Sequence, residues 1–426
     1  MTLAASSTRT FHTEHPGPQA LAAARAALDA IASCDGRIKA WEFVAGAASL
    51  APPELAEGAL AGLPFGVKDM IDVAGMPTSC GSAAYAGTVA HFDAGCVALL
   101  RAAGAVPIGK TVTTEFAYVT PGATRNPVDL RYTPGGSSSG SAAAVAAGMV
   151  PFALGTQTGG SMIRPAAFCG VPGFKPTFGA VDREGMKVTC ESLDVIGWYG
   201  DSVRRLADVG HALLPYGRAQ GMRPLKGLRI AFLHGNPGYE LGAEADAALA
   251  SACRALANRV ALIKPVPAFG PALQLLEAYD VIMHFEYARN LLPTVTGSPS
   301  LLSRRLLNAV EKGLAISAAG YSGMRAFQET ERLKWEAYFG DADLILTSSA
   351  LGPAPRGIEH TGSSAFNKGW SLLGWPCLHL PTSFSKEGLP LGVQLVGRPG
   401  SDAQLLACGE AIHPVVDERS KHLGRP

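Results

Sequence analysis

Two stretches rich in glycine and serine could support chemistry. Residues 134–148 read PGGSSSGSAAAVAAG, and residues 155–170 read GTQTGGSMIRPAAFCG. In the second stretch, paired glycines permit backbone angles that let consecutive N–H groups point to one place. Such a turn can hold an oxyanion beside a serine nucleophile. The residues that would form it are Thr158, Gly159, Gly160 and Ser161.

A serine nucleophile needs a base, and a neutral lysine can serve. Lys68 ends the apolar run GLPFGV, and burial in such a setting lowers the pKa of a lysine. Taken singly, the glycines are ordinary turns and Lys68 is a surface charge at the end of a strand. The lysine followed by the two clusters, in this order, favours an active site.

A second motif indicates a different protein class. Residues 104–111, GAVPIGKT, match the P-loop pattern, with its glycines at Gly104 and Gly109 followed by Lys110 and Thr111. A true P-loop follows a strand and opens a helix, whereas here a helical pattern precedes the motif and the motif itself resembles a strand. Pro107 also removes one of the amides that would hold phosphate. These departures argue against a P-loop, and a nucleotide-binding protein is kept as the alternative hypothesis because the letters of the motif match.

A Ser-His-Asp hydrolase is a third hypothesis. It would place a serine in a GxSxG turn, with a histidine later in the chain. Ser139, which lies between Ser138 and Gly140, does not occupy that frame. His360 and His379 lie downstream, without a carboxylate context that distinguishes them.

Composition excludes several classes of partner. The chain has 426 residues, 47% hydrophobic and 17% charged, with a net charge of +1. We therefore expect neither a nucleic acid nor a membrane as partner, and leave a homodimer open. The eight cysteines and ten histidines show no metal-binding spacing, so we expect no metal and no cofactor. The N-terminus has no apolar run and no segment reaches the roughly 18 apolar residues of a membrane span, which predicts a cytoplasmic protein.

Hydrophobic patterning predicts strands alternating with helices. Helices are expected at 17–33, 93–104, 141–149 and 244–259, and strands near 62–68, 105–111, 225–233 and 343–350. This alternation predicts a sheet covered by helices on both faces. Residues 262–340 are the least patterned and are expected to hold substrate-specific elements. No domain boundary is visible.

Four segments together resemble the amidase signature family of serine amidases. They are GLPFGVKD, RNPVDLRYTPGGSSSGSAAAVAAG, GTQTGGSMIRPAAFCGVPGFKPTFG and, at 371–406, SLLGWPCLHLPTSFSKEGLPLGVQLVGRPGSDAQLL. The intervals from Lys68 to Ser137 and from Ser137 to Ser161 are also similar to those of the family's catalytic triad. Residues 262–340 match poorly.

The resemblance implies a role for each matched residue. Ser161 would be the acyl-forming nucleophile, Ser137 the bridging serine and Lys68 the terminal base. The peptide corresponding to Gly136–Ser137 is cis in the family, and Ser138 would support the triad.

Two positions depart from the family pattern. The family usually has aspartate where this chain has Gln157, and arginine where it has Ile163, with Arg164 one residue later. We expect Arg164 either to turn outwards or to bind a carbonyl.

The resemblance also implies the fold and the reaction. The fold would be a three-layer α/β/α domain with a large twisted mixed sheet, as a single domain over residues 1–426. Residues 61–200 would form the catalytic core, and about 262–340 a variable substrate-binding segment.

The reaction would be hydrolysis of a C–N bond in a small aryl or alkyl amide, a carbamate (urethane) or a urea, with ester cleavage as a side activity. A glutamine-derived amide is a further candidate. The family's tRNA-dependent amidotransferase subunit fits less well, because the net charge is near zero and no docking segment is evident. A catalytically silent binding protein on the same fold is the remaining alternative. A pocket lined by Tyr118, Phe152 or Trp375 would favour apolar or aromatic groups.

Overall fold

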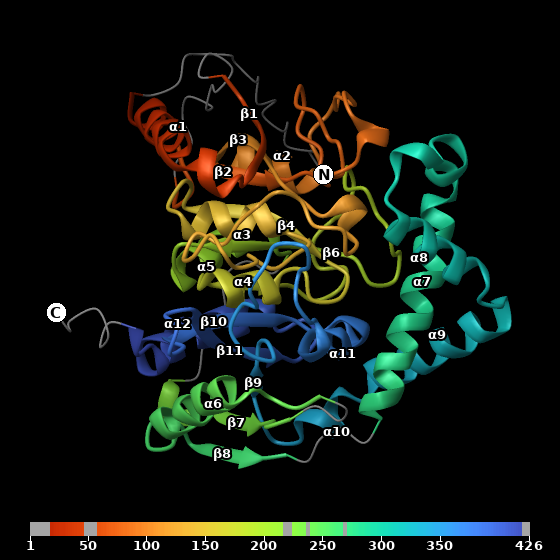
Figure 1. The fold of residues 1–426 in the computed structure, drawn as a ribbon. Coiled ribbons are helices and arrows are strands. Elements are labelled where there is room, and N and C mark those ends of the chain that lie inside the picture. Colours follow the sequence, from red (N-terminus) through yellow and green to blue (C-terminus); the bar gives the residue numbers. More distant parts are fainter. Residues whose placement is uncertain (1–17, 47–57, 216–223, 236–238, 267–270, 420–426) are drawn as a thin grey trace, which may run out of the picture.

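A single mixed sheet organises the chain. The computed structural model describes residues 18–46, 58–215, 224–235, 239–266 and 271–419. Within these residues the sheet has 11 strands (Figure 1). In spatial order they are β1 (Trp41–Val44), β3 (Val106–Thr111), β2 (Pro64–Lys68), β4 (Phe152–Gln157), β6 (Val195–Gly200), β5 (Gly173–Lys175), β10 (Cys377–Phe384), β11 (Pro390–Gly397), β9 (Leu344–Ser348), β7 (Arg229–Phe232) and β8 (Leu262–Pro265).

Three parallel strands bring the candidate site residues to one edge of the sheet. β2 pairs in parallel with β3 on one side and with β4 on the other, and all three strands are buried. Because parallel strands end at the same edge, Lys68 at the end of β2 lies near the loop that follows β4. That loop is residues 158–161, the second glycine-serine cluster.

Helices cover both faces of the sheet. On one face α2, α5, α6 and α12 pack in one layer, and on the other α3 and α4 pack against each other and against the strands. This confirms the predicted α/β class with three layers and a large mixed sheet. The helices outside residues 262–340 are α1 (Pro18–Ile38), α2 (Gly95–Ala102), α3 (Ser139–Ala146), α4 (Ile163–Cys169), α5 (Val203–Leu213), α6 (Ala243–Leu256), α11 (Ala365–Leu373) and α12 (Asp402–Val416).

The poorly patterned segment 262–340 is mostly helical. After β8 it forms α7 (Ala272–Gly297), α8 (Arg304–Leu314), α9 (Ala318–Leu333) and α10 (Trp335–Phe339). Helices α7, α8 and α9 stand together beside the sheet, in teal in Figure 1. A buried cluster joins them to the sheet, with Tyr279 and Ile282 of α7 and Ile345 of β9 among its members. Among the helices of the described ranges, none is long and apolar enough to cross a bilayer.

The residues that match a P-loop form a strand. Lys110 lies inside β3, and its buried Nζ contacts Asp69 Oδ1 at 3.1 Å. The same amine donates to Thr78 Oγ1 at 2.7 Å and to the Pro77 carbonyl at 3.0 Å. These contacts occupy the lysine inside the protein, where no phosphate can reach it. The nucleotide-binding hypothesis is therefore wrong.

Replacing Lys110 with alanine should destabilise the fold. The change leaves the Asp69 carboxylate buried without its cationic partner, which typically costs about 3–5 kcal/mol. Thermal unfolding should show a clear fall in Tm for Lys110→Ala and none for Lys226→Ala, which removes an exposed lysine. Calorimetry with ATP and magnesium should detect no binding. Micromolar ATP affinity that is lost in Lys110→Ala would contradict this role.

Candidate active site

Lys68 is a buried amine held by two hydroxyl groups. Its Nζ donates to Ser137 Oγ at 2.7 Å and to Thr156 Oγ1 at 2.6 Å. Burial lowers the pKa of Lys68 from 10.5 to about 7, because a buried ammonium loses its hydration, although the charge of Asp194 opposes the shift. Asp69 points to the opposite side of the strand, towards Lys110. Lys68 can therefore be a neutral base near pH 7.

The first glycine-serine stretch is packed against the sheet. Ser138 Oγ accepts from the Thr156 amide at 3.1 Å and donates to the Thr156 carbonyl at 3.0 Å. Ser141 Oγ donates to the Leu154 carbonyl at 2.8 Å. These bonds fix the start of α3 on β4, so that Ser137 lies directly before a rigid helix.

Ser161 lies in the loop between β4 and α4. Its side chain is 7% exposed, and its carbonyl accepts from the Tyr199 hydroxyl at 3.1 Å. No other described residue accepts a hydrogen bond from the amides of Gly159, Gly160 or Ser161. The Ser161 hydroxyl likewise has no bonded partner in the described ranges. The structure thus joins Lys68 to Ser137, while the bond from Ser137 to Ser161 is not formed.

Gln157 fastens both ends of this loop. Its Oε1 accepts from the amides of Met162 at 2.7 Å and Ile163 at 3.1 Å, and its Nε2 donates to Ser371 Oγ at 2.9 Å. Ser371 Oγ in turn donates to the Gly159 carbonyl at 2.7 Å. Because C=O and N–H point in opposite directions across a trans peptide, this bond directs the next amide, the N–H of residue 160, away from Ser371.

Arg164 binds two backbone carbonyls. Its Nε and Nη2 donate to the Gly136 carbonyl at 3.2 and 2.6 Å, and its Nη1 donates to the Gly362 carbonyl at 2.7 Å. Burial lowers the pKa of Arg164 to about 10, so it is charged at neutral pH. Of the two expected outcomes, the second occurs: Arg164 binds carbonyls. The Gly136–Ser137 peptide that it contacts is cis.

Three residues close to the site were missed by sequence reasoning: Thr156, Ser371 and Asp194. The buried carboxylate of Asp194 accepts from Thr158 Oγ1 at 2.5 Å, and from the amides of Thr189 at 2.7 Å and Cys190 at 2.9 Å. Burial raises the pKa of Asp194, although these hydrogen bonds oppose the shift. No motif marks any of the three, since each acts through a segment distant in the chain.

A cavity of about 440 Å³ opens above Ser161. Residues 158–161, the loop predicted to hold an oxyanion and called the oxyanion loop below, line it together with Arg164 and residues 361–365. Helices α7 and α8, from the segment 262–340, supply one wall. The side chains that those helices contribute are Tyr279, Asp280, Met283, His284, Tyr287 and Lys312.

Of the three aromatic residues suggested for the lining, only Tyr118 borders the cavity. Phe152 stacks on Phe65 inside the sheet, with ring centroids 5.0 Å apart. Trp375 is buried against Tyr338 and Phe339. The last two side chains belong to the core, because the segments that carry them are buried.

The two histidines considered as bases lie outside the cavity lining. His379 is fully buried, and its Nδ1 contacts Ser349 Oγ at 2.6 Å. Burial lowers the pKa of His379 to about 3. His360 is near Glu359, at 3.9 Å. In the part of the chain that the structure describes, no group of His, Cys, Asp or Glu residues could hold a metal ion.

The chain belongs to the Amidase family. The family's profile matches residues 22–406. The chain is therefore an amidase-family enzyme that acts on C–N bonds.

Known proteins with similar sequences and structures agree on the family. A glutamyl-tRNA(Gln) amidotransferase subunit from Psychrobacter sp. (strain PRwf-1) is 32% identical, covering 85% of this chain and 84% of the relative. A crystal structure of an amidase has a TM-score of 0.84 at 30% identity, covering 93% of this chain and 96% of the other. The native peptide amidase from Stenotrophomonas maltophilia has a TM-score of 0.77 at 25% identity, covering 95% and 96%.

Proposed function

We propose that the chain is a serine amidase that hydrolyses its substrate through an acyl-enzyme on Ser161. The observation that carries the proposal is the buried Lys68 amine in contact with Ser137, beside a serine whose neighbouring amides are free of partners among the described residues. Each part alone occurs in ordinary turns and cores. Together they supply a base, a proton relay, a nucleophile and an oxyanion site.

The reaction proceeds in two acyl-transfer steps. As Ser161 Oγ attacks the substrate carbonyl, its proton passes to Ser137, whose own proton passes to neutral Lys68. The N–H groups of residues 158–161 stabilise the oxyanion. The proton returns through Ser137 to the leaving nitrogen, and the C–N bond breaks. Water then attacks the acyl-enzyme by the same relay, which releases the acid and restores Ser161.

The charges around the cavity favour a substrate that carries an anionic group. Lys368 is paired with Asp280 at 3.0 Å, and Arg164 is occupied by carbonyls. Lys312 is exposed at the cavity and forms no ion pair with another described residue. The tyrosines of the wall suit an apolar or aromatic group. The proposed substrate is a small amide or carbamate with an apolar body and a carboxylate facing Lys312.

Matched substrates test both the reaction and this preference. A panel of anilides, alkyl amides and carbamates, each with and without a carboxylate, is assayed for released amine. Replacing Lys312 with methionine should raise KM for the carboxylated member of a pair by up to roughly fivefold, the upper limit for an exposed ion pair, and leave the neutral member unchanged. Lys226→Met removes an exposed lysine that does not line the cavity and serves as the control.

Two results would contradict the proposal. Equal effects of Lys312→Met on both members of a pair would remove the anionic preference. No released amine across the panel would contradict an independent amidase.

The relatives named as amidotransferase subunits raise a second candidate. The alignment with the Psychrobacter subunit covers 85% of this chain, so the second candidate is a subunit of an amidotransferase complex. Such a subunit would act together with partner proteins, on a glutamine-derived amide. Turnover of anilides by the purified chain alone favours the independent amidase.

A further inference from the structure

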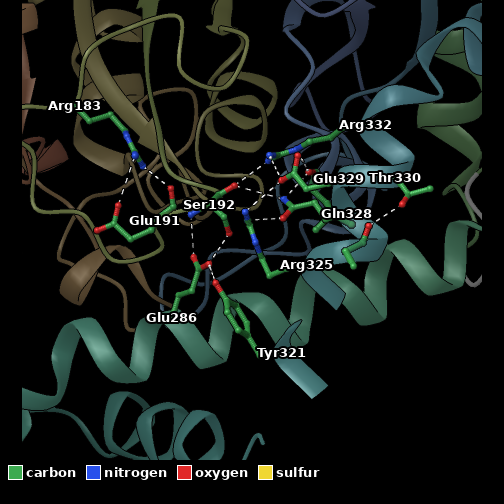
Figure 2. Close-up of polar contacts among 12 residues, drawn as sticks. Arg183, Glu191, Ser192, Glu286, Tyr321, Arg325, Gln328, Glu329, Thr330 and Arg332 are labelled. Atoms are coloured by element: carbon green, nitrogen blue, oxygen red, sulfur yellow. Dashed lines mark hydrogen bonds and ion pairs between the residues drawn. The ribbon is translucent and has the colours of Figure 1, made fainter. Parts of the chain in front are cut away.

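Two side chains of α9 reach into the core and hold two backbone carbonyls. Gln328 Nε2 donates to the Leu372 carbonyl at 2.8 Å and, more weakly, to the Ser192 carbonyl at 3.5 Å. Arg332 makes the same pair of contacts, from Nη2 to the Ser192 carbonyl at 2.9 Å and from Nε to the Leu372 carbonyl at 3.1 Å. Figure 2 shows both side chains converging on Ser192. The two carbonyls are thus tied together through α9.

The amide, the hydroxyl and the carbonyl of Ser192 all form hydrogen bonds. Its amide donates to Glu286 Oε2 at 3.0 Å and its hydroxyl donates to Glu286 Oε1 at 2.7 Å. Tyr321 of α9 donates to the same carboxylate at 2.7 Å (Figure 2). Gln328 is fully buried, and Glu286 is buried as well. Buried bonds of this kind are costly to break, so the segment around Ser192 is fixed to α7 and α9.

Both carbonyls belong to segments that support the oxyanion loop. Residues 190–194 close a turn, and Asp194 at its end accepts from Thr158. Leu372 follows Ser371, whose hydroxyl holds the Gly159 carbonyl. The two carbonyls that α9 binds therefore lie within two residues of the side chains that hold the oxyanion loop. Ser192 is close to Asp194, which holds Thr158, and Leu372 is next to Ser371, which holds Gly159.

We propose that Gln328 and Arg332 are positioning residues for the oxyanion loop. By fixing the distance between the Ser192 and Leu372 carbonyls, they set how Asp194 holds Thr158 relative to how Ser371 holds Gly159. This role rests on the proposed function, because only a loop that stabilises an oxyanion needs such alignment. Neither residue lines the cavity, so neither touches substrate.

Helices α7 and α9 thus have two roles, one at the cavity and one at the oxyanion loop. Helix α7 presents Tyr279 and Tyr287 to the cavity and Glu286 to Ser192. Helix α9 then links that wall to the loop beside the nucleophile. The structure gives this segment a part in the alignment of catalytic groups in addition to substrate contact.

Substitution of Gln328 tests the proposal. Gln328→Met keeps the volume but removes the donors, and a displacement of about 1 Å at a catalytic group can cost on the order of 10²-fold. We expect kcat to fall by about 10- to 100-fold, with KM unchanged within about twofold and with weaker binding of a boronic acid that mimics the tetrahedral intermediate. Arg332→Lys, a milder change that keeps the charge but cannot reach both carbonyls in the same plane, should show the same split to a smaller extent.

Thr330→Ala is the matched control on the same helix. Its hydroxyl bonds only within α9, to the Ala326 carbonyl at 2.8 Å, as Figure 2 shows for Thr330. This variant should keep kcat, KM and boronic acid affinity. Folded Gln328→Met with unchanged kcat would overturn the proposal. A parallel loss of Tm and activity in Gln328→Met and Arg332→Lys would also overturn it, because such a loss indicates a general structural effect.

Hydrogen exchange separates this proposal from the proposed function. The bonded amides that hold the loop are those of Met162 and Ile163 on Gln157 and of Thr189 and Cys190 on Asp194. They should exchange faster in Gln328→Met than in wild type, and not in Thr330→Ala. Unchanged exchange would overturn the coupling even where activity is lost. If wild type releases no amine and a sulfonyl fluoride does not label Ser161, the proposed function fails. Faster exchange in Gln328→Met would then show that α9 holds the loop in place, but the catalytic role of Gln328 and Arg332 would be overturned.

Discussion

Ser161→Ala should abolish amide turnover and leave the chain folded. Loss of a serine nucleophile from a triad that works as a unit lowers kcat by a factor on the order of 10⁶. The Ser161 hydroxyl bonds to no other described residue, so its removal leaves no buried group without a partner. Released amine measures turnover, and thermal unfolding should give the Tm of the wild type.

Covalent labelling identifies the nucleophile independently. A sulfonyl fluoride should add to Ser161 and not to Ser137 or Ser138, because of these three serines only Ser161 lines the cavity. Peptide mass mapping locates the adduct. An adduct on a different serine, or full activity in Ser161→Ala, would exclude Ser161 as the nucleophile.

Activity should rise with pH as Lys68 loses its proton. With its pKa lowered to about 7 by burial, the neutral fraction of Lys68 grows tenfold per pH unit below that value and levels off above it. The profile of kcat/KM should therefore climb to an alkaline plateau governed by one group. Lys68→Ala should lose about 10²-fold or more, the usual contribution of a general base. Lys68→Arg should fail too, because a guanidinium keeps its proton.

Lys175 provides the matched control for this experiment. It is also a buried lysine, but its Nζ donates to the Pro176 carbonyl at 2.8 Å and it does not line the cavity. Lys175→Met should keep the pH profile, even if it changes Tm. An active Lys68→Arg enzyme, or a profile that stays flat between about pH 6 and 8, would rule out the lysine-base mechanism.

Local pattern was enough to predict most of the elements that hold the site. The helix expected near Pro18 is α1, and the strand expected at 105–111 is β3. The strand expected at 225–233 is shorter, because residues Leu225–Gly227 form a 3₁₀ turn before β7 begins at Arg229. The order of lysine and serine clusters, with the family resemblance, indicated which residues to examine together.

Contacts between distant segments could not be read from the sequence. Thr156 contacts Lys68 only because β2 and β4 pair in parallel. Ser371 reaches Gln157 from a distant part of the chain, 214 positions away, and no spacing rule connects them. The targets of Arg164 depended in the same way on how the loop at Gly362 folds back. The catalytic roles of the triad and of the oxyanion loop stay predictions.

The buried amine of Lys68 also links the stability of the protein to pH. The unfolded chain holds the Lys68 proton up to about pH 10.5, whereas the folded chain releases it near pH 7. Between these values the unfolded state binds the extra proton, so this group makes the free energy of unfolding rise with pH. Its unfavourable contribution is complete below about pH 7 and disappears above about pH 10.5. The property that makes Lys68 a base therefore weakens the fold most where the base is protonated and idle.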